Sequence, residues 1–417
     1  MIVSRLPLLC CLLCLPVAAA TGQDAAGLFA TFKDRIFQIR VIDQEAEEKS
    51  ALGTGFLVAY DGLIATNYHV IADYADKPDK YRLEYEDEQG NKGGLTLLDI
   101  DVINDLALLS AAALGREPLR IQLDEPDQGD TIYSIGNPYD IGFTVVPGTY
   151  NGIAQDSYYK RIHFSGSINA GMSGGPVLNA AGDIVGINVS TAGNQISFLV
   201  PVAALRELIG ARRAADAPVV DFATRIREQL VANQRGLIDG VLAAEWPTQE
   251  LGEGVAVDEM APFVKCWGGS TDDKRLYRTV SSSCSSDEDV YVGPGLRTGV
   301  IAYQFFWLEA DDLSAPRFQS YYRSLFSDFM PDNGADEDNV TNFACDEMFV
   351  EPAPGAVDKV VLCLRAYRKF GGLYDALYVS GSVDWQDRAF ISHFTLAGVE
   401  PDTLTAFMER FQQVVRR

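Results

Sequence analysis

The strongest constraint on the fold is a series of short segments in which apolar and polar residues alternate. Alternation with a period of two is typical of strands that are buried on one face. Before residue 202 such segments are 37–41, 81–86, 95–103, 131–135, 144–146, 161–164, 184–189 and 196–200. Turn residues separate them, so the pattern predicts a mainly β fold. The length of this part of the chain fits a double antiparallel β-barrel.

The spacing of apolar residues changes to three and four after Pro201. This spacing predicts a helix over Val202–Ile209 and a second helix over about Phe222–Ala244, with a small, proline-containing connection between them. The later part of the chain is rich in aromatic residues and contains strands and helices. We therefore expect a first domain over residues 25–212, a helical linker over 213–249 and a C-terminal α+β domain over 250–417.

The run from Gly171 to Pro176 can place a serine hydroxyl beside free backbone N–H groups. Glycine at 171 allows the preceding peptide to turn its N–H toward a carbonyl, so the N–H groups of Gly171 and Ser173 could form an oxyanion hole. A serine hydroxyl is a weak nucleophile until a neighbouring base accepts its proton. The motif therefore requires a base elsewhere in the chain.

Only three histidines can supply that base. His69 follows two apolar segments joined by a turn at Asp61-Gly62, which predicts a β-hairpin that carries His69 at its far end. Asp105 precedes the apolar run Leu106–Leu109 and could orient the imidazole. Each of these features alone is common in turns and caps, but together they predict a catalytic triad of His69, Asp105 and Ser173.

These three contexts, in this order, resemble the trypsin-like serine protease family, and most closely its bacterial HtrA-type branch. The resemblance covers about residues 30–212 and includes Gly53-Thr54-Gly55-Phe56, Gly136-Asn137-Pro138 and Gly186-Ile187-Asn188. It implies two barrels with the triad in the cleft between them and hydrolysis of polypeptide substrates through an acyl-enzyme. It also implies that no metal or organic cofactor is needed. Met172 departs from the Asn or Asp common in the family, at a position that offers only its backbone.

The resemblance also places a substrate pocket around Ser167, Asn188 and Ser190. None of these side chains carries a charge, so we expect cleavage after small or medium apolar residues. Two alternatives to an endopeptidase remain: a catalytically latent protease-fold module that binds proteins or acts as a chaperone, and a structural envelope protein that works through residues 250–417.

The first twenty residues predict an export signal. Arg5 is followed by an apolar stretch and by Ala18-Ala19-Ala20, as in a cleaved signal peptide, with lipidation of Cys14 as the alternative. The stretch is too short to span a membrane, and no other segment of the chain is apolar for long enough. We expect a periplasmic or secreted protein.

Removal of residues 1–20 leaves Cys266, Cys284, Cys345 and Cys363. Four cysteines in an exported chain predict two disulfides with three possible connectivities, whereas the spacing and the absence of nearby histidines disfavour a zinc site. The net charge of −24 disfavours nucleic acid and anionic lipid as partners.

The two halves of residues 250–417 look weakly alike. Each has a pair of cysteines, an aromatic strand and a helix that begins at proline, so duplication of one unit is a hypothesis. HtrA-type proteins commonly continue into PDZ domains, but no Gly-Leu-Gly-Phe-like loop occurs here. The region could instead bind a protein partner that the sequence does not identify.

Overall fold

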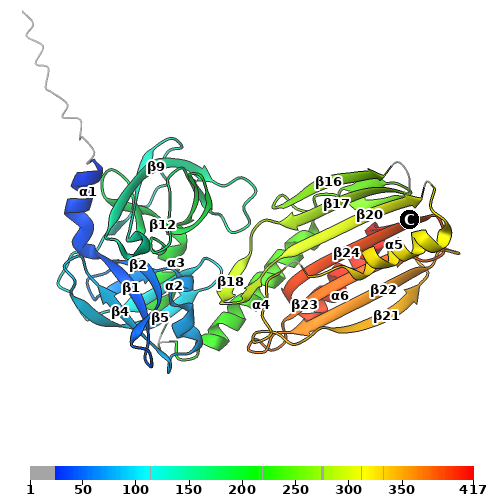
Figure 1. The fold of residues 1–417 in the computed structure, drawn as a ribbon. Helices are drawn as coiled ribbons and strands as arrows, with labels where there is room; N and C mark the ends of the chain where they lie inside the picture. The colour runs from blue at the N-terminus through cyan, green and yellow to red at the C-terminus, as the bar shows by residue number, and fades with distance from the viewer. Residues whose placement is uncertain are drawn as a thin grey trace, which may run out of the picture.

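The computed structural model describes residues 24–417 except 113, 216, 218, 274–276, 311 and 332. The structure has two parts that lie side by side (Figure 1). They are a barrel part, residues 24–214, and a sheet part, residues 248–417. The long helix α4 (Phe222–Ala243) runs between them. The predicted signal peptide lies outside the described residues.

The barrel part begins with helix α1 (Ala25–Phe32), the 3-10 turn η1 (Lys33–Arg35) and a closed six-stranded barrel of order β1-β2-β3-β6-β5-β4. The strands are β1 (Ile36–Asp43), β2 (Glu48–Leu57), β3 (Leu63–Thr66), β4 (Tyr81–Glu86), β5 (Lys92–Asp101) and β6 (Leu106–Ser110). Helix α2 (Tyr68–Asp76) follows β3 and buries Tyr68, Val70 and Ile71 against this barrel.

A second barrel follows, and its ends close through the pairing of β11 with β12. Its strands are β8 (Thr131–Gly136), β9 (Thr144–Ile153), β10 (Ile162–Phe164), β11 (Pro176–Leu178), β12 (Asp183–Gly193) and β13 (Ile196–Pro201). Strand β7 (Arg120–Ile121) pairs with β12, and the 3-10 turn η2 (Pro138–Asp140) precedes β9. The predicted mainly β, double-barrel fold is confirmed.

Helices α3 (Val202–Ala214) and α4 confirm the predicted helical segments. Leu205 and Leu208 of α3 join a core that contains Phe56 of the first barrel and Ile187 of the second, so α3 helps to join the barrels. Helix α4 packs Ile226 and Leu230 on the first-barrel core. Leu237, Ile238 and Val241, farther along α4, pack in the core of the sheet part. One helix therefore serves both cores.

The sheet part contains a seven-stranded antiparallel sheet of order β16-β17-β20-β24-β23-β22-β21 and two small hairpins. The sheet strands are β16 (Val264–Asp273), β17 (Tyr277–Ser286), β20 (Ile301–Ala310), β21 (Ala344–Val350), β22 (Asp358–Ala366), β23 (Tyr374–Ser382) and β24 (Arg388–Val399). The hairpins are β14 (Thr248–Leu251) with β15 (Gly254–Val257), and β18 (Val290–Gly293) with β19 (Leu296–Thr298).

Two helices cover opposite faces of this sheet. On β24, Phe394 and Leu396 pack with Phe407 of helix α6 (Pro401–Val414), whereas Ile391 packs with Phe318 of helix α5 (Ala315–Ser327). Figure 1 shows α5 and α6 on the two sides of the sheet. The period-two alternation along β24 therefore supplies a separate core to each helix.

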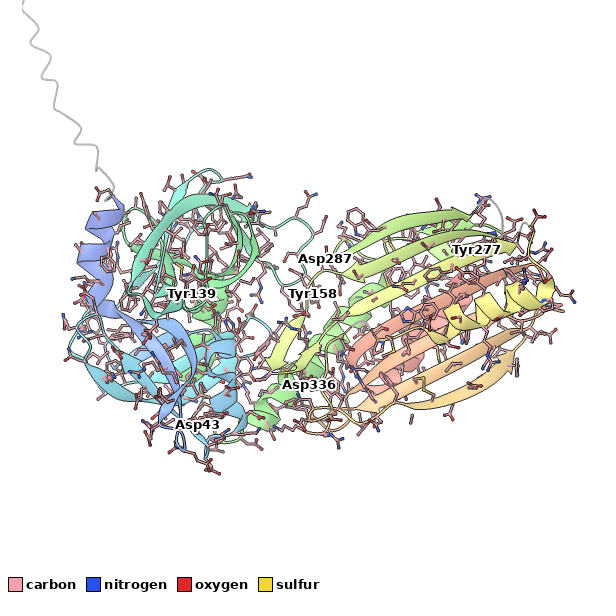
Figure 2. All side chains as sticks on the ribbon, in the orientation of Figure 1. Asp43, Tyr139, Tyr158, Tyr277, Asp287 and Asp336 are labelled. Carbon is pink, nitrogen blue, oxygen red and sulfur yellow. A yellow bond between two sulfur atoms is a disulfide. The ribbon has the colours of Figure 1, made fainter. Side chains whose placement is uncertain are left out.

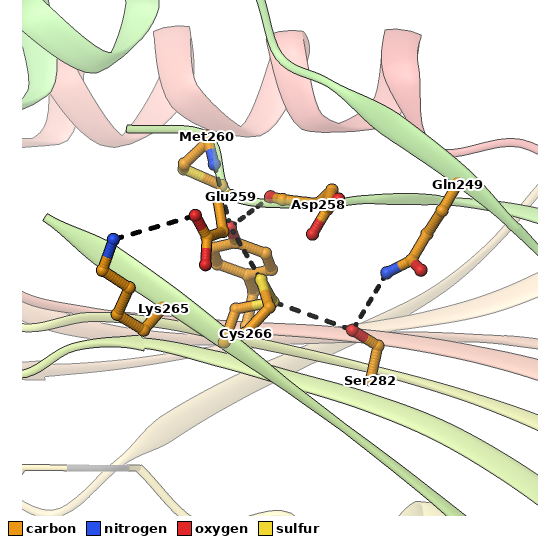
Figure 3. The surroundings of a disulfide bond; sticks show 9 residues. Gln249, Asp258, Glu259, Met260, Lys265, Cys266 and Ser282 are labelled. Carbon is orange, nitrogen blue, oxygen red and sulfur yellow. Dashed lines mark hydrogen bonds and ion pairs between the residues drawn. A yellow bond between two sulfur atoms is a disulfide. The ribbon is translucent and has the colours of Figure 1, made fainter. Parts of the chain in front are cut away.

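Disulfides join Cys266 to Cys284 and Cys345 to Cys363. Each disulfide links two residues that lie directly opposite each other on the last two strands at one edge of the sheet. These strands are β16 and β17 at one edge, and β21 and β22 at the other. Figure 3 shows the surroundings of the first disulfide, with Cys266 and Asp258 labelled. The Tyr303 hydroxyl lies 3.8 Å from Cys266 Sγ and donates to the Asp258 carbonyl at 2.5 Å. The two bridges are placed alike in the two halves. Duplication of one unit stays a prediction.

Candidate active site

The loop that contains Ser173 lies just before β11 and depends on two glycines in the left-handed region. Gly171 has φ +93° and Gly174 has φ +81°. A Cβ on Gly171 would lie 2.3 Å from the Asn137 carbonyl oxygen, and one on Gly174 would lie 2.3 Å from the Thr54 carbonyl oxygen. Only glycine fits both the backbone conformation and the space, so the sequence Gly-Met-Ser-Gly determines the loop shape.

Thr54 of β2 holds this loop against the first barrel. Its backbone N–H donates to the Ser173 carbonyl at 2.8 Å, and its hydroxyl donates to the Gly171 carbonyl at 2.7 Å. The sequence motif around Thr54 carried the family resemblance, but its pattern gave no signal that Thr54 would contact the serine loop across 117 residues. These bonds join the serine loop of the second barrel to the first barrel, which carries His69.

Two backbone N–H groups of the loop have no protein acceptor among the described residues: those of Gly171 and Ser173. The other three N–H groups of residues 171–175 are paired: that of Met172 donates to the Asn169 carbonyl, that of Gly174 to the Asn188 carbonyl and that of Gly175 to the Met172 carbonyl. Unpaired N–H groups beside a nucleophile can donate hydrogen bonds to the oxyanion of a tetrahedral intermediate. The loop therefore offers the two donors that the sequence predicted for an oxyanion hole.

His69 lies in the first turn of α2, immediately after β3. The predicted hairpin of β2 and β3 is present, but its second strand ends at Thr66, three residues earlier than expected for a strand that carries the histidine. The reason is tertiary, because Tyr68, Val70 and Ile71 are all buried in helical geometry on the first-barrel core. Local apolar alternation does not reveal this packing.

Asp105 makes two hydrogen bonds with His69. Its Oδ2 lies 2.6 Å from His69 Nδ1, and its Oδ1 accepts from the His69 backbone N–H at 2.8 Å. The Asp105 side chain is 11% exposed and its backbone has φ +60°, a conformation that is strained for a residue other than glycine. The carboxylate thus holds the Nδ1–H tautomer and leaves Nε2 available as an acceptor.

The pKa of His69 is raised above its usual value. Burial opposes the protonated imidazole, but the charge of Asp105 and its hydrogen bond outweigh burial, while the nearby Arg297 guanidinium lowers the pKa. No hydrogen bond joins Ser173 Oγ to His69 in the described part of the chain. Catalytic hydrogen bonds are often long in the absence of substrate and shorten when it binds.

The three predicted pocket residues lie in different surroundings. Ser167 and Ser190 are exposed, and Ser190 lines a cavity that also contains His69. Asn188 is fully buried; it accepts from the Ser134 hydroxyl at 2.8 Å and its amide donates to the Met172 carbonyl at 3.2 Å. The structure therefore gives Asn188 a supporting place beneath the serine loop and not a place on the cleft surface.

Two residues near the site come from the sheet part, and sequence reasoning missed both. The ring of Tyr291 lies edge-on to His69 with centroids 6.2 Å apart, and Arg297 acts electrostatically on the same imidazole. Both belong to the hairpin β18–β19, more than 200 positions after His69, and no pattern in the sequence connects them. Within the described ranges, no cluster of three or more His, Cys, Asp or Glu is arranged to hold a metal ion.

Comparison with known proteins relates the barrel part to serine proteases. Residues 53–187 match the trypsin-like peptidase domain. Serine protease HTRA1 of Xenopus laevis is 32% identical over 173 residues, which cover 39% of this chain and 36% of the frog protein. A probable periplasmic serine endoprotease DegP-like of Ectopseudomonas mendocina (strain ymp) is 36% identical over 185 residues, which cover 41% and 37% of the two chains.

The solved structures that are similar include the serine endoprotease from Yersinia pestis. It is 25% identical, covers 46% of this chain and 67% of its own, and has a TM-score of 0.41. The chain spans little more than a third of the length of the two curated relatives. The family match itself lies wholly within the barrel part.

Proposed function

Because residues 53–187 match the trypsin-like peptidase domain, we propose that this protein is a serine endopeptidase whose nucleophile is Ser173. Two observations carry the proposal together: His69 is hydrogen-bonded to Asp105 on the first barrel, and the serine loop attached to that barrel has unpaired N–H groups at Gly171 and Ser173. Acyl transfer needs a nucleophile, a base and an oxyanion site together.

In the proposed mechanism, Ser173 Oγ attacks the peptide carbonyl while His69 Nε2 accepts its proton. Asp105 orients the imidazole and stabilises the imidazolium that forms, and the N–H groups of Gly171 and Ser173 donate to the oxyanion. His69 then returns the proton to the leaving amine. A water molecule, deprotonated by the same imidazole, releases the acyl group from Ser173.

The proposed substrates are polypeptides with a small or medium apolar residue before the cleaved bond. Support comes from the uncharged residues Ser167 and Ser190 at the predicted pocket, since neither can attract a lysine, arginine or glutamate side chain. An uncharged pocket selects mainly by shape, and one methylene changes the preference by only about 10–200-fold. The preference is therefore expected to be graded.

We also propose that the protein is exported to the periplasm or secreted. Two disulfides are typical of an oxidising compartment, and a similar bacterial protein carries a periplasmic description. Among the helices of residues 24–417 that the structure describes, none is long and apolar enough to cross a membrane. The predicted leader, residues 1–20, is consistent with the same route.

Labelling with a fluorophosphonate probe tests the proposed nucleophile. Wild-type protein is expected to react rapidly and in one-to-one stoichiometry because the base activates Ser173, whereas Ser173→Ala is expected to remain unlabelled. Ser50→Ala serves as the matched control, since Ser50 is an exposed serine of β2 in the same barrel part and lies outside the proposed site. If the wild-type protein is labelled no faster than Ser173→Ala, the endopeptidase proposal is refuted and the latent binding module is favoured.

The pKa of His69 predicts how activity depends on pH. Neutral imidazole is the active form, so kcat/KM should fall on acidification through a pKa above the usual value of about 6.5. Asp105 raises this pKa, Arg297 lowers it and Tyr291 faces the ring without a charge. In Arg297→Gln the acid limb should therefore move to higher pH, while in Arg206→Gln, on the exposed face of α3, it should not. A pH profile of kcat/KM measures both.

A further inference from the structure

A cavity of about 620 Å³ lies where the barrel part meets the sheet part. His69, Arg161 and Ser190 line it from the barrels, and Phe263, Tyr291 and Arg297 line it from the sheet part. Tyr158 and Asp287, which lie at this junction in Figure 2, belong to the two sides. The cavity contains the candidate base but neither Ser173 nor Gly171, so it extends away from the oxyanion donors.

The hairpin β18–β19 is docked firmly on the barrel part. Just before the hairpin, the Glu288 carboxylate accepts from the Ser157 hydroxyl at 2.5 Å and from the backbone N–H of Tyr158 at 2.7 Å. At the other side, the buried hydroxyl of Tyr68 donates to the Val292 carbonyl at 2.7 Å. Tyr68 precedes His69 in α2, so the hairpin is attached directly to the helix that carries the base.

A buried polar cluster holds the same hairpin from behind. Asp375 is fully buried and accepts from Arg365 Nε at 2.8 Å, from the Tyr367 hydroxyl at 2.7 Å and from Asn333 at 2.9 Å. The Tyr367 hydroxyl also lies 3.1 Å from Thr298 Oγ1, at the end of β19. Because the hairpin is fixed from both sides, Tyr291 occupies a defined position beside His69.

Two of the three Lys and Arg side chains that line the cavity form ion pairs within the protein. Lys265 pairs with Asp156 at 3.1 Å, and Arg297 pairs with Asp289 at 2.7 Å. The Arg161 guanidinium donates to the carbonyls of Ile103 and Asn104, while Glu288 is occupied by the donors described above. Arg161 and Glu288 have no ion-pair partner among the described residues, and the exposed Asp287 acts on Lys265 only at longer range. The five carboxylates of the lining outnumber its three Lys and Arg side chains.

What remains for a ligand is mainly apolar surface. The side chains that supply it are Val102, Tyr159, Val189, Phe198, Phe263 and Val290, with the ring of Tyr291 next to His69. A cavity with this lining binds apolar groups through burial and through contact with aromatic rings. A carboxylate would lose its hydration there and would meet a lining in which acidic side chains outnumber basic ones.

We propose that the sheet part completes the substrate cleft, with Tyr291 forming a wall against which an apolar or aromatic side chain of the bound polypeptide packs. This inference rests on the proposed endopeptidase function. A polypeptide whose reacting carbonyl lies at Ser173 must pass His69, and the cavity begins at that imidazole. The sheet part thereby acts in substrate selection, in addition to any partner it binds elsewhere.

Peptide libraries with the mature full-length protein test this wall. At each of about four positions on either side of the cleaved bond, Phe, Ala and Glu are compared by kcat/KM. Wild type is expected to prefer Phe over Ala by about tenfold at one position, and to disfavour Glu there. Tyr291→Ala should reduce the Phe preference to near parity, whereas Tyr291→Phe, which keeps the ring, should retain it. Tyr60→Ala, at an exposed turn of the first barrel, is the matched control.

A second variant distinguishes loss of the aromatic wall from displacement of the whole hairpin. Tyr291→Trp enlarges the wall and should shift the preference from Phe toward Ala. General damage to the site would instead lower kcat/KM for all substrates alike. If Tyr291→Ala and Tyr291→Trp both keep the wild-type ratio of Phe to Ala, the wall is refuted although the endopeptidase stands. A wild-type preference for Glu at this position would refute the apolar site. Absence of fluorophosphonate labelling would instead remove the endopeptidase and this inference together.

Discussion

Replacement of Asp105 by asparagine is expected to lower kcat by about 10⁴-fold, because the amide no longer holds the His69 tautomer that accepts the serine proton. The structure supports an effect of this size, since Asp105 is the sole partner of His69 Nδ1 in the described chain and also accepts from the His69 backbone. Steady-state kinetics on a cleaved peptide measures the loss.

Two controls make the Asp105→Asn result specific. Asp61→Asn changes an exposed carboxylate at the turn between β2 and β3 and should leave kcat unchanged. Circular dichroism should show that Asp105→Asn retains the β fold. If the folded variant loses less than about tenfold in kcat, Asp105 does not orient the base and the assigned triad is wrong.

Replacement of Asp375 by asparagine is expected to destabilise the sheet part by about 3–5 kcal/mol, because it leaves a buried guanidinium without its carboxylate. Asp375 is fully buried, and the side chain of its ion-pair partner Arg365 is 10% exposed. The same carboxylate also accepts from Tyr367, Asn333 and the Gly398 backbone, so several bonds change together. Urea denaturation measures the free energy of unfolding.

An exposed ion pair in the same sheet provides the matched control. Glu347 of β21 pairs with Lys359 of β22 at 2.8 Å, and the Glu347 side chain is 62% exposed. Glu347→Gln should change the free energy of unfolding by no more than about 1 kcal/mol, since solvent screens such pairs. Equal losses in the two variants would show that burial does not decide the stability of the Asp375 cluster.

Several features of this protein follow from local sequence. Period-two alternation and short apolar runs predicted most strands of both barrels, and spacing of three and four predicted α3 and α4, because these patterns reflect which side of an element faces the core. The glycines at 171 and 174 predicted the serine loop, since their positive φ values exclude other residues. The four cysteines that follow the predicted leader predicted two disulfides.

Other features depend on contacts between distant segments. His69 lies on a helix because the barrel core buries Tyr68 and Ile71 together, and Asn188 supports the serine loop because β12 brings it beneath Met172. The pairings of the disulfides follow from the register of β16 with β17 and of β21 with β22. None of these contacts has a local pattern that could reveal it.

The sequence by itself determined the chemical groups and the elements that carry them: a serine in a glycine loop, a histidine, an aspartate and two barrels of strands. Only the tertiary structure decided that a hairpin of the sheet part lies beside His69 and that charges around this cavity pair with one another. The physical reason is that backbone preferences act over a few neighbouring residues, whereas the position of Tyr291 depends on hydrogen bonds and packing between segments more than 200 positions apart.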